Sequence, residues 1–122
     1  MTDLRVLVVD DDRGNCEVVA RLLAERGYQV DTACDGESAL DLINQFAYQL
    51  AVLDYQMPGM NGVELFRRAR GIRPEMKGVF LTAYTSINTV FPAIEAGVER
   101  VLAKPADARE LIPLVDHLVA AD

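Results

Sequence analysis

The sequence has no tryptophan, one histidine and two cysteines, so few residues are available for a thiol, imidazole or soft-metal site. Cys16 and Cys34 form neither a CxxC pair nor a metal-binding spacing with His117. We therefore interpret both as small buried hydrophobic residues rather than redox groups. His117 stands on the last predicted helix, away from the acidic residues, and is expected at the surface.

Long apolar runs are missing as well. No segment approaches the roughly 20 consecutive apolar residues of a membrane span. The first residues lack the basic segment and the apolar segment that a secretion signal requires. These features lead us to expect a cytoplasmic protein without a membrane partner.

Positive charge is scarce, because 12 Lys and Arg stand against 19 Asp and Glu and the formal net charge is -7. Affinity for nucleic-acid backbones comes mainly from Lys and Arg, so we expect no direct nucleic-acid binding by this domain. The 122 residues fit one domain, 1–122. A chain of this size buries roughly two thirds of its unfolded surface, so it needs no disulfide or structural metal.

What the sequence does contain is a regular alternation of short apolar runs and helical patterns. Four unbroken runs, typical of strands covered on both faces, begin at Val6, Leu50, Val79 and Val101. Residues 29–33 alternate polar and apolar side chains, as an edge strand does. Five strand–helix units predict an α/β fold, a doubly wound parallel sheet with right-handed crossovers. With the edge strand outside the first, the order is 2-1-3-4-5, the flavodoxin-like (βα)5 sandwich.

Glycines and prolines mark the expected helix boundaries. Gly27, Gly71 and Gly97 each stand where a helix should stop in a left-handed residue. Asp107 with Glu110 predicts a capping box at the start of the last helix.

Pro92 and Pro113 fall inside the predicted fourth and fifth helices, where each removes a backbone donor. Either these helices are bent, or each begins late, with its proline near the first turn. We favour a shortened or bent fourth helix.

Acidic residues follow the two strands that border the expected crevice. Asp10, Asp11 and Asp12 come after the first strand, and Asp54 ends the third. Carboxylates this close repel one another unless a cation neutralises them. Mg²⁺ suits them because it takes oxygen ligands and often completes its shell with water and phosphate. Asp12 can instead simply cap the following helix.

A carboxylate at this crevice can attack phosphorus and form an aspartyl phosphate, a transfer that needs mainly positioning and charge neutralisation. Asp54 is the best placed nucleophile. Lys104 and Thr82, at the ends of the fifth and fourth strands, supply a positive charge and a hydroxyl donor. Either residue alone is common at a strand end, so the interpretation depends on their combination.

Five separated motifs in this order resemble the receiver domains of two-component response regulators, chemotaxis regulators among them, over nearly the whole chain. The motifs are Val8-Val9-Asp10-Asp11, Leu53-Asp54, Met57-Pro58-Gly59-Met60-Asn61-Gly62, Thr82-Ala83 and Lys104-Pro105.

The resemblance implies that Asp54 is the phosphoacceptor. It also implies that Asp10, Asp11, Asp54 and the backbone carbonyl of Gln56 hold Mg²⁺. Thr82 and Lys104 would contact the phosphoryl group, and the bond from Lys104 to the following proline would be a cis peptide.

Receivers of this family take the phosphoryl group from a histidine kinase or a phosphotransfer protein, and many accept it from acetyl phosphate. They catalyse only their own phosphorylation and slow dephosphorylation. The resemblance therefore implies a signalling domain that acts on a downstream protein or a covalently linked effector domain. Such domains are monomers or weak homodimers, and they switch at the face formed by the fourth helix, fifth strand and fifth helix.

Two positions depart from the family pattern. Val101 stands where many receivers have an aromatic ring that follows the movement of Thr82, and Ala106 follows Lys104-Pro105, where Phe is frequent. We predict that aromatic coupling through this position is absent. Tyr84, two residues past Thr82, is expected to hinder water and lengthen the life of the phosphoryl group.

Two other functions share this topology. An Asp-dependent phosphohydrolase usually has a second carboxylate two residues after the nucleophile, where this chain has Gln56. A flavodoxin-like cofactor module needs a phosphate-binding loop after the first strand, whereas the three acids there would repel a phosphate. Turnover of phosphate esters, or a coloured purified protein, would favour these alternatives.

Overall fold

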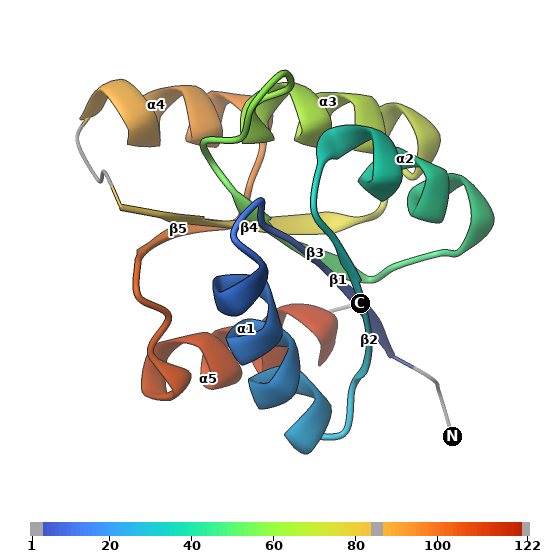
Figure 1. Cartoon of the computed structure of the whole chain (residues 1–122), viewed down its shortest axis with the longest axis vertical. Helices are drawn as coiled ribbons and strands as arrows, with labels where there is room; N and C mark the ends of the chain where they lie inside the picture. The colour runs from blue at the N-terminus through green and yellow to red at the C-terminus, as the bar shows by residue number, and fades with distance from the viewer. Residues whose placement is uncertain (1–3, 84–86, 121–122) are drawn as a thin grey trace.

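The computed structural model describes residues 4–83 and 87–120, in which five strands and five helices alternate (Figure 1). The strands are β1 (Arg5–Val9), β2 (Gln29–Ala33), β3 (Leu50–Asp54), β4 (Lys77–Thr82) and β5 (Arg100–Ala103). The helices are α1 (Arg13–Glu25), α2 (Gly36–Gln45), α3 (Gly62–Ile72), α4 (Ile87–Ala96) and α5 (Ala108–Ala120). All paired strands are parallel, in the order β2-β1-β3-β4-β5, so the predicted topology is confirmed.

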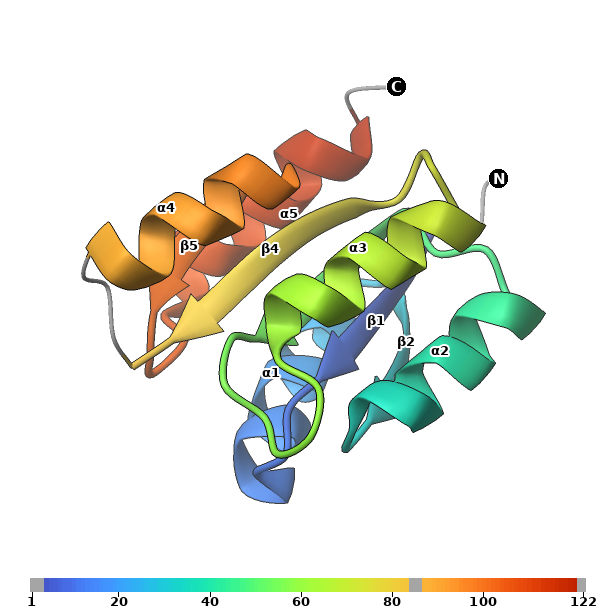
Figure 2. The same ribbon diagram turned by 90° about the horizontal axis from the view of Figure 1, so that it is seen from above.

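The helices form a layer on each face of the sheet. In Figure 1 the sheet is seen nearly edge-on, with α2, α3 and α4 on one face and α1 and α5 on the other. Figure 2 shows α2, α3 and α4 in front of the sheet, running roughly along the direction of the strands. No helix in the described part of the chain is long and apolar enough to cross a membrane.

Two hydrophobic cores, one on each face of the sheet, explain the unbroken apolar runs. In β1, Leu7 and Val9 pack into the core beneath α2, α3 and α4, whereas Val6 and Val8 pack into the core beneath α1 and α5. All four side chains are at most 2% exposed. Because successive side chains of a strand point to opposite faces, a strand covered on both faces must be apolar at every position.

Two of the three predicted helix-ending glycines adopt the left-handed conformation. Gly27 has φ 108° and Gly97 has φ 99°. The prediction for Gly71 is wrong, because this residue lies inside α3 and its φ is not positive. The backbone N–H of Arg73 still bonds the carbonyl of Ala69 at 2.7 Å, so the helical hydrogen bonds continue past Gly71.

Both prolines lie well inside their helices, since Pro92 follows five residues of α4 and Pro113 follows five residues of α5. The alternative of a late start, with each proline in the first turn, is therefore wrong. Bending at these residues stays a prediction.

The two cysteines differ in exposure. Cys16 is buried in α1 as predicted, but Cys34 is exposed, so the prediction of a second buried hydrophobic residue is wrong. Cys34 lies one residue beyond the end of β2, and the next residue, Asp35, caps α2. His117 is exposed on α5, as expected.

Candidate functional site

The acidic residues meet at the carboxyl edge of the sheet, where β1 and β3 end side by side. Val9 of β1 pairs with Leu53 of β3, so the residues that follow, Asp10 and Asp54, are neighbours across the two strands. The side chains of both are buried, with only 4% and 7% exposure, whereas Asp11 is exposed. Asp10 and Asp54 thus meet where the first and third strands end, as the strand order predicted.

Three of these carboxylates are close enough to share one cation. One ligand oxygen from each of Asp10, Asp11 and Asp54 lies within 4.8 Å of the others. Hard divalent cations are bound by such groups of carboxylate oxygens. The cluster could therefore hold a divalent metal ion.

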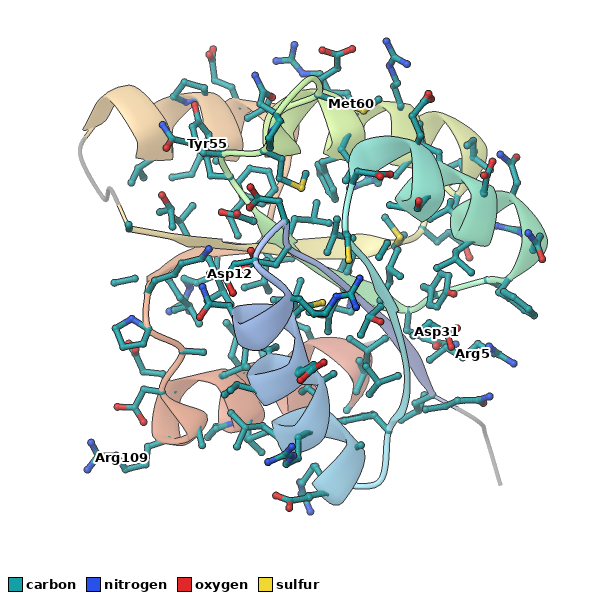
Figure 3. The ribbon with its side chains drawn as sticks, viewed as in Figure 1. Arg5, Asp12, Asp31, Tyr55, Met60 and Arg109 are labelled. Carbon is teal, nitrogen blue, oxygen red and sulfur yellow. The ribbon has the colours of Figure 1, made fainter. Side chains whose placement is uncertain are left out.

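Asp12 stays outside the cluster and caps α1. Its side chain accepts a hydrogen bond from the backbone N–H of Asn15 at 3.1 Å, and Figure 3 shows it at the first turn of the helix. Its own backbone N–H donates to Oδ1 of Asp10 at 2.9 Å. Asp12 thus orients a cluster carboxylate through its backbone while its side chain stabilises the helix start.

Lys104 brings a positive charge to the cluster from the end of β5. Its Nζ lies 3.0 Å from Oδ2 of Asp10 and 3.2 Å from Oδ1 of Asp54. The Lys104–Pro105 peptide is cis, as predicted, and the backbone N–H of Lys104 donates to the carbonyl of Thr82 at 2.8 Å.

Lys104 does not fully offset the burial of Asp54 and its repulsion by Asp10. Burial and then the charge of Asp10 raise the pKa of the Asp54 carboxyl to about 6, although Lys104 acts in the opposite direction. Burial lowers the pKa of Lys104, but its hydrogen bonds and ion pairs with Asp10 and Asp54 outweigh that cost and raise it above its ordinary value. Lys104 pairs with two of the three carboxylates, so a divalent cation would relieve the remaining repulsion.

Thr82 and Gln56 border the cluster in different ways. Thr82 is buried at the end of β4, next to the strand that carries Asp54. Gln56 is exposed, and its backbone N–H lies 3.4 Å from Oδ1 of Asp54. Tyr84 is outside the described residues, so its expected shielding role stays a prediction.

A hollow of about 530 Å³ opens beside the cluster. Its lining comes from Asp11 and the loop after β3, namely Tyr55, Gln56, Met57, Pro58 and Asn61. Asn61 caps α3, and Tyr55 and Met60 lie on the α3 side of the sheet in Figure 3. The sequence predicted a site role in this loop only for the Gln56 carbonyl, and it gave no sign that Tyr55, Met57, Pro58 and Asn61 line a hollow.

A family model described as the response regulator receiver domain matches residues 6–116. The chain belongs to this family. This receiver domain is 38% identical to the response regulator MprA of Mycobacterium tuberculosis over 109 residues. The matched region covers 89% of this chain and 47% of MprA. The chain thus spans about half the length of the curated relatives that it matches.

Solved receiver structures are also similar to this domain. A CheY-like receiver domain protein from Methanospirillum hungatei JF-1 superposes with a TM-score of 0.93 at 29% identity, over 98% of this chain and 96% of that one. A response regulator from Burkholderia pseudomallei, with a phosphorylated aspartic acid, a calcium ion and citrate, gives a TM-score of 0.87 at 28% identity. That match covers 98% of this chain and 70% of the other.

Proposed function

We propose that this receiver domain accepts a phosphoryl group on Asp54 in a Mg²⁺-dependent reaction, from a histidine kinase or a phosphotransfer protein. The observation that supports this most strongly is the meeting of Asp10, Asp11 and Asp54 within 4.8 Å, with Lys104 paired to two of them. The proposed setting is the cytoplasm.

The proposed metal ligands are the carboxylates of Asp10, Asp11 and Asp54 and the backbone carbonyl of Gln56. Oxygen donors of this kind suit Mg²⁺, which also keeps several waters in its shell. When bound, Mg²⁺ supplies positive charge that offsets the carboxylates and the phosphoryl oxygens. The similar Burkholderia protein, which holds a calcium ion and a phosphorylated aspartic acid, supports a cation and a phosphoaspartate on this fold.

In the proposed reaction a carboxylate oxygen of Asp54 forms a bond to phosphorus, while the bond from phosphorus to the donor breaks and the donor keeps the electron pair. Lys104, already 3.2 Å from Oδ1 of Asp54, would pair with a phosphoryl oxygen. The hydroxyl of Thr82 would donate to another. Attack by water on the same phosphorus would later break its bond to the Asp54 oxygen, release inorganic phosphate and restore the free carboxylate.

The proposed output is a change at the face of α4, β5 and α5, started by movement of Thr82. Val101 pairs with Phe80 across β5 and β4, so an aliphatic side chain stands where a moving ring would be needed. The movement would therefore pass through the backbone. The hydrogen bond from the Lys104 N–H to the Thr82 carbonyl joins the ends of β5 and β4. A downstream protein or a linked effector domain would read this face, and the domain itself would be a monomer or a weak homodimer.

The test is the intact mass of the protein after incubation with acetyl phosphate and Mg²⁺. We expect one phosphoryl addition to the natural sequence, and none with Asp54→Asn or when a chelator removes the metal. Asp12→Asn is the matched control, because this acid caps α1 outside the cluster and an amide caps as well. It should be phosphorylated like the natural sequence.

Addition to Asp54→Asn, or metal-independent addition, would contradict the proposal. If the natural sequence gains no phosphoryl group, a shift of its melting temperature by Mg²⁺ separates two cases. If Mg²⁺ raises the melting temperature of the natural sequence but not that of Asp11→Asn, the metal site is present and the receiver requires its protein donor. If Mg²⁺ leaves the melting temperature of the natural sequence unchanged, the proposed metal site is contradicted as well.

A further inference from the structure

Cys16 and Cys34 both lie beside Ala33, the last residue of the edge strand β2. Cys16 packs with Val8 in the core beneath α1 and α5. Ala33, the last residue of β2, packs into the opposite core. Cys34 follows Ala33 directly, one residue beyond the end of the strand, and it is exposed.

The Cys16 side chain also lies close to the backbone that leads into Cys34. The Sγ of Cys16 lies 3.6 Å from the carbonyl oxygen of Val8 and 4.0 Å from that of Ala33. The carbonyl carbon of Ala33 is bonded directly to the nitrogen of Cys34, so the Cys16 sulfur lies within one peptide unit of the Cys34 backbone. The disulfide form requires a Cα separation of roughly 4.4–6.8 Å.

We propose that Cys16 and Cys34 are a redox modification site that closes reversibly into an intramolecular disulfide when the protein meets a small-molecule disulfide such as oxidised glutathione. The site is separate from the chemistry proposed for Asp54 and does not depend on it. It joins the first half of α1 to the end of β2, and both segments flank Asp10.

The exposure of the two thiols sets the order of the reaction. Cys34 is exposed and meets the oxidant first, whereas Cys16 is only 3% exposed. An oxidant in solution cannot reach the buried Cys16 sulfur as readily, so Cys16 acts second.

The steps balance as two thiol–disulfide exchanges. The Cys34 sulfur attacks one sulfur of oxidised glutathione, forms a mixed disulfide, and releases one reduced glutathione. The Cys16 sulfur then loses its proton to solvent, attacks the Cys34 sulfur, and releases the second reduced glutathione. In total the two protein thiols lose two electrons and two protons, and one oxidised glutathione gains them and becomes two reduced glutathione molecules.

The experiment treats the reduced protein with oxidised glutathione, blocks free thiols with N-ethylmaleimide, and measures intact and peptide masses. The expected product is lighter by two hydrogen atoms, carries neither glutathione nor maleimide, and contains a peptide cross-linked between Cys16 and Cys34. A dithiol reductant should restore the starting mass. With Cys16→Ser, the glutathione adduct on Cys34 should persist at least about tenfold longer.

Two control variants test whether Cys34 reacts first and whether the Cys16 substitution disturbs the fold. In Cys34→Ser, which changes an exposed position, Cys16 should stay unmodified in the folded protein. If Cys16→Ser lowers the urea midpoint, Cys16→Ala replaces it, since alanine leaves no hydroxyl in the core. The proposal is overturned if the natural protein keeps its adduct as long as the Cys16 variant does, or if the product is a dimer joined through Cys34.

Discussion

Gly62 lets the loop after β3 pass directly against the backbone of Asp54. Its N–H donates to the carbonyl of Tyr55 at 2.8 Å, which ties the start of α3 to the residue after the proposed phosphoacceptor. A Cβ atom at this position would lie 2.5 Å from the carbonyl oxygen of Asp54 and 3.1 Å from Cα of Tyr55. Both neighbours are backbone atoms, so neither can move aside without shifting the site.

We therefore expect Gly62→Ala to lower the free energy of unfolding by about 1–3 kcal/mol, the usual cost of forcing an extra carbon into a packed region. Gly71→Ala is the matched control in the same helix, because a Cβ there meets nothing within 4 Å. It should raise the free energy of unfolding by up to about 1 kcal/mol, as alanine favours helix over glycine. Urea unfolding measures both, and a similar change in the two variants would contradict the proposed close approach.

At the scale of whole elements, α5 is bonded to the segment that follows the C-terminal end of α1, and yet it carries a proline in its middle. The carboxylate of Asp116 accepts hydrogen bonds from the Tyr28 hydroxyl and from Nε of Arg26, the latter at 2.9 Å. Pro113, by contrast, gives α5 no N–H for the carbonyl four residues earlier, that of Arg109. The helix is thus held by tertiary contacts at a place where its own hydrogen bonding is interrupted.

Replacing this proline should stabilise the protein. Pro113 is exposed, so Pro113→Ala removes no buried contact and supplies the missing donor, with an expected gain of up to about 3 kcal/mol in the free energy of unfolding. Pro74→Ala is the control, since Pro74 lies in the exposed turn between α3 and β4. That variant should lose up to about 1 kcal/mol because the unfolded chain gains freedom. A loss with Pro113→Ala in urea unfolding would contradict the interpretation.

At the scale of the whole molecule, two tyrosine–aspartate pairs join segments that are distant in sequence. Tyr28 pairs with Asp116, 88 residues away, and the Tyr48 hydroxyl donates to Oδ2 of Asp31 at 2.6 Å. Arg5 also contacts Asp31, at 3.2 Å, and Figure 3 shows these two side chains together at the edge of the sheet. Burial, and then the aspartate partner, raises the pKa of each tyrosine above its ordinary value of 10.0.

These shifts predict a loss of stability at alkaline pH. A raised pKa means that the fold favours the neutral tyrosine, so the contribution is complete below pH 10.0 and is lost as pH rises toward the folded-state pKa. Urea unfolding at a series of alkaline pH values should show this decline. Tyr28→Phe and Tyr48→Phe should each make the decline shallower, because phenylalanine has no proton to lose. An unchanged slope in both variants would contradict the prediction.

Much of the fold and of the candidate site follows from local sequence. The run that begins at Val6 is apolar at every position because β1 has a core on each face, and this pattern is readable without coordinates. Asp10 and Asp54 were predicted to meet because parallel strands bring their carboxyl ends to one edge. The motif order then identified the family that the comparison bears out.

Only the tertiary structure decided how the individual side chains are surrounded. Cys16 lies between Asn15 and Glu17, and Cys34 lies between Ala33 and Asp35, so sequence neighbours do not explain why Cys16 is buried and Cys34 exposed. The distances from Lys104 to Asp10 and Asp54 likewise depend on strands that are far apart in the sequence. The close contact that excludes a Cβ atom at Gly62 depends on how the loop after β3 folds back on Asp54. Periodicity reports the local backbone and the buried face of each element, whereas burial and distance depend on which elements pack together and how closely.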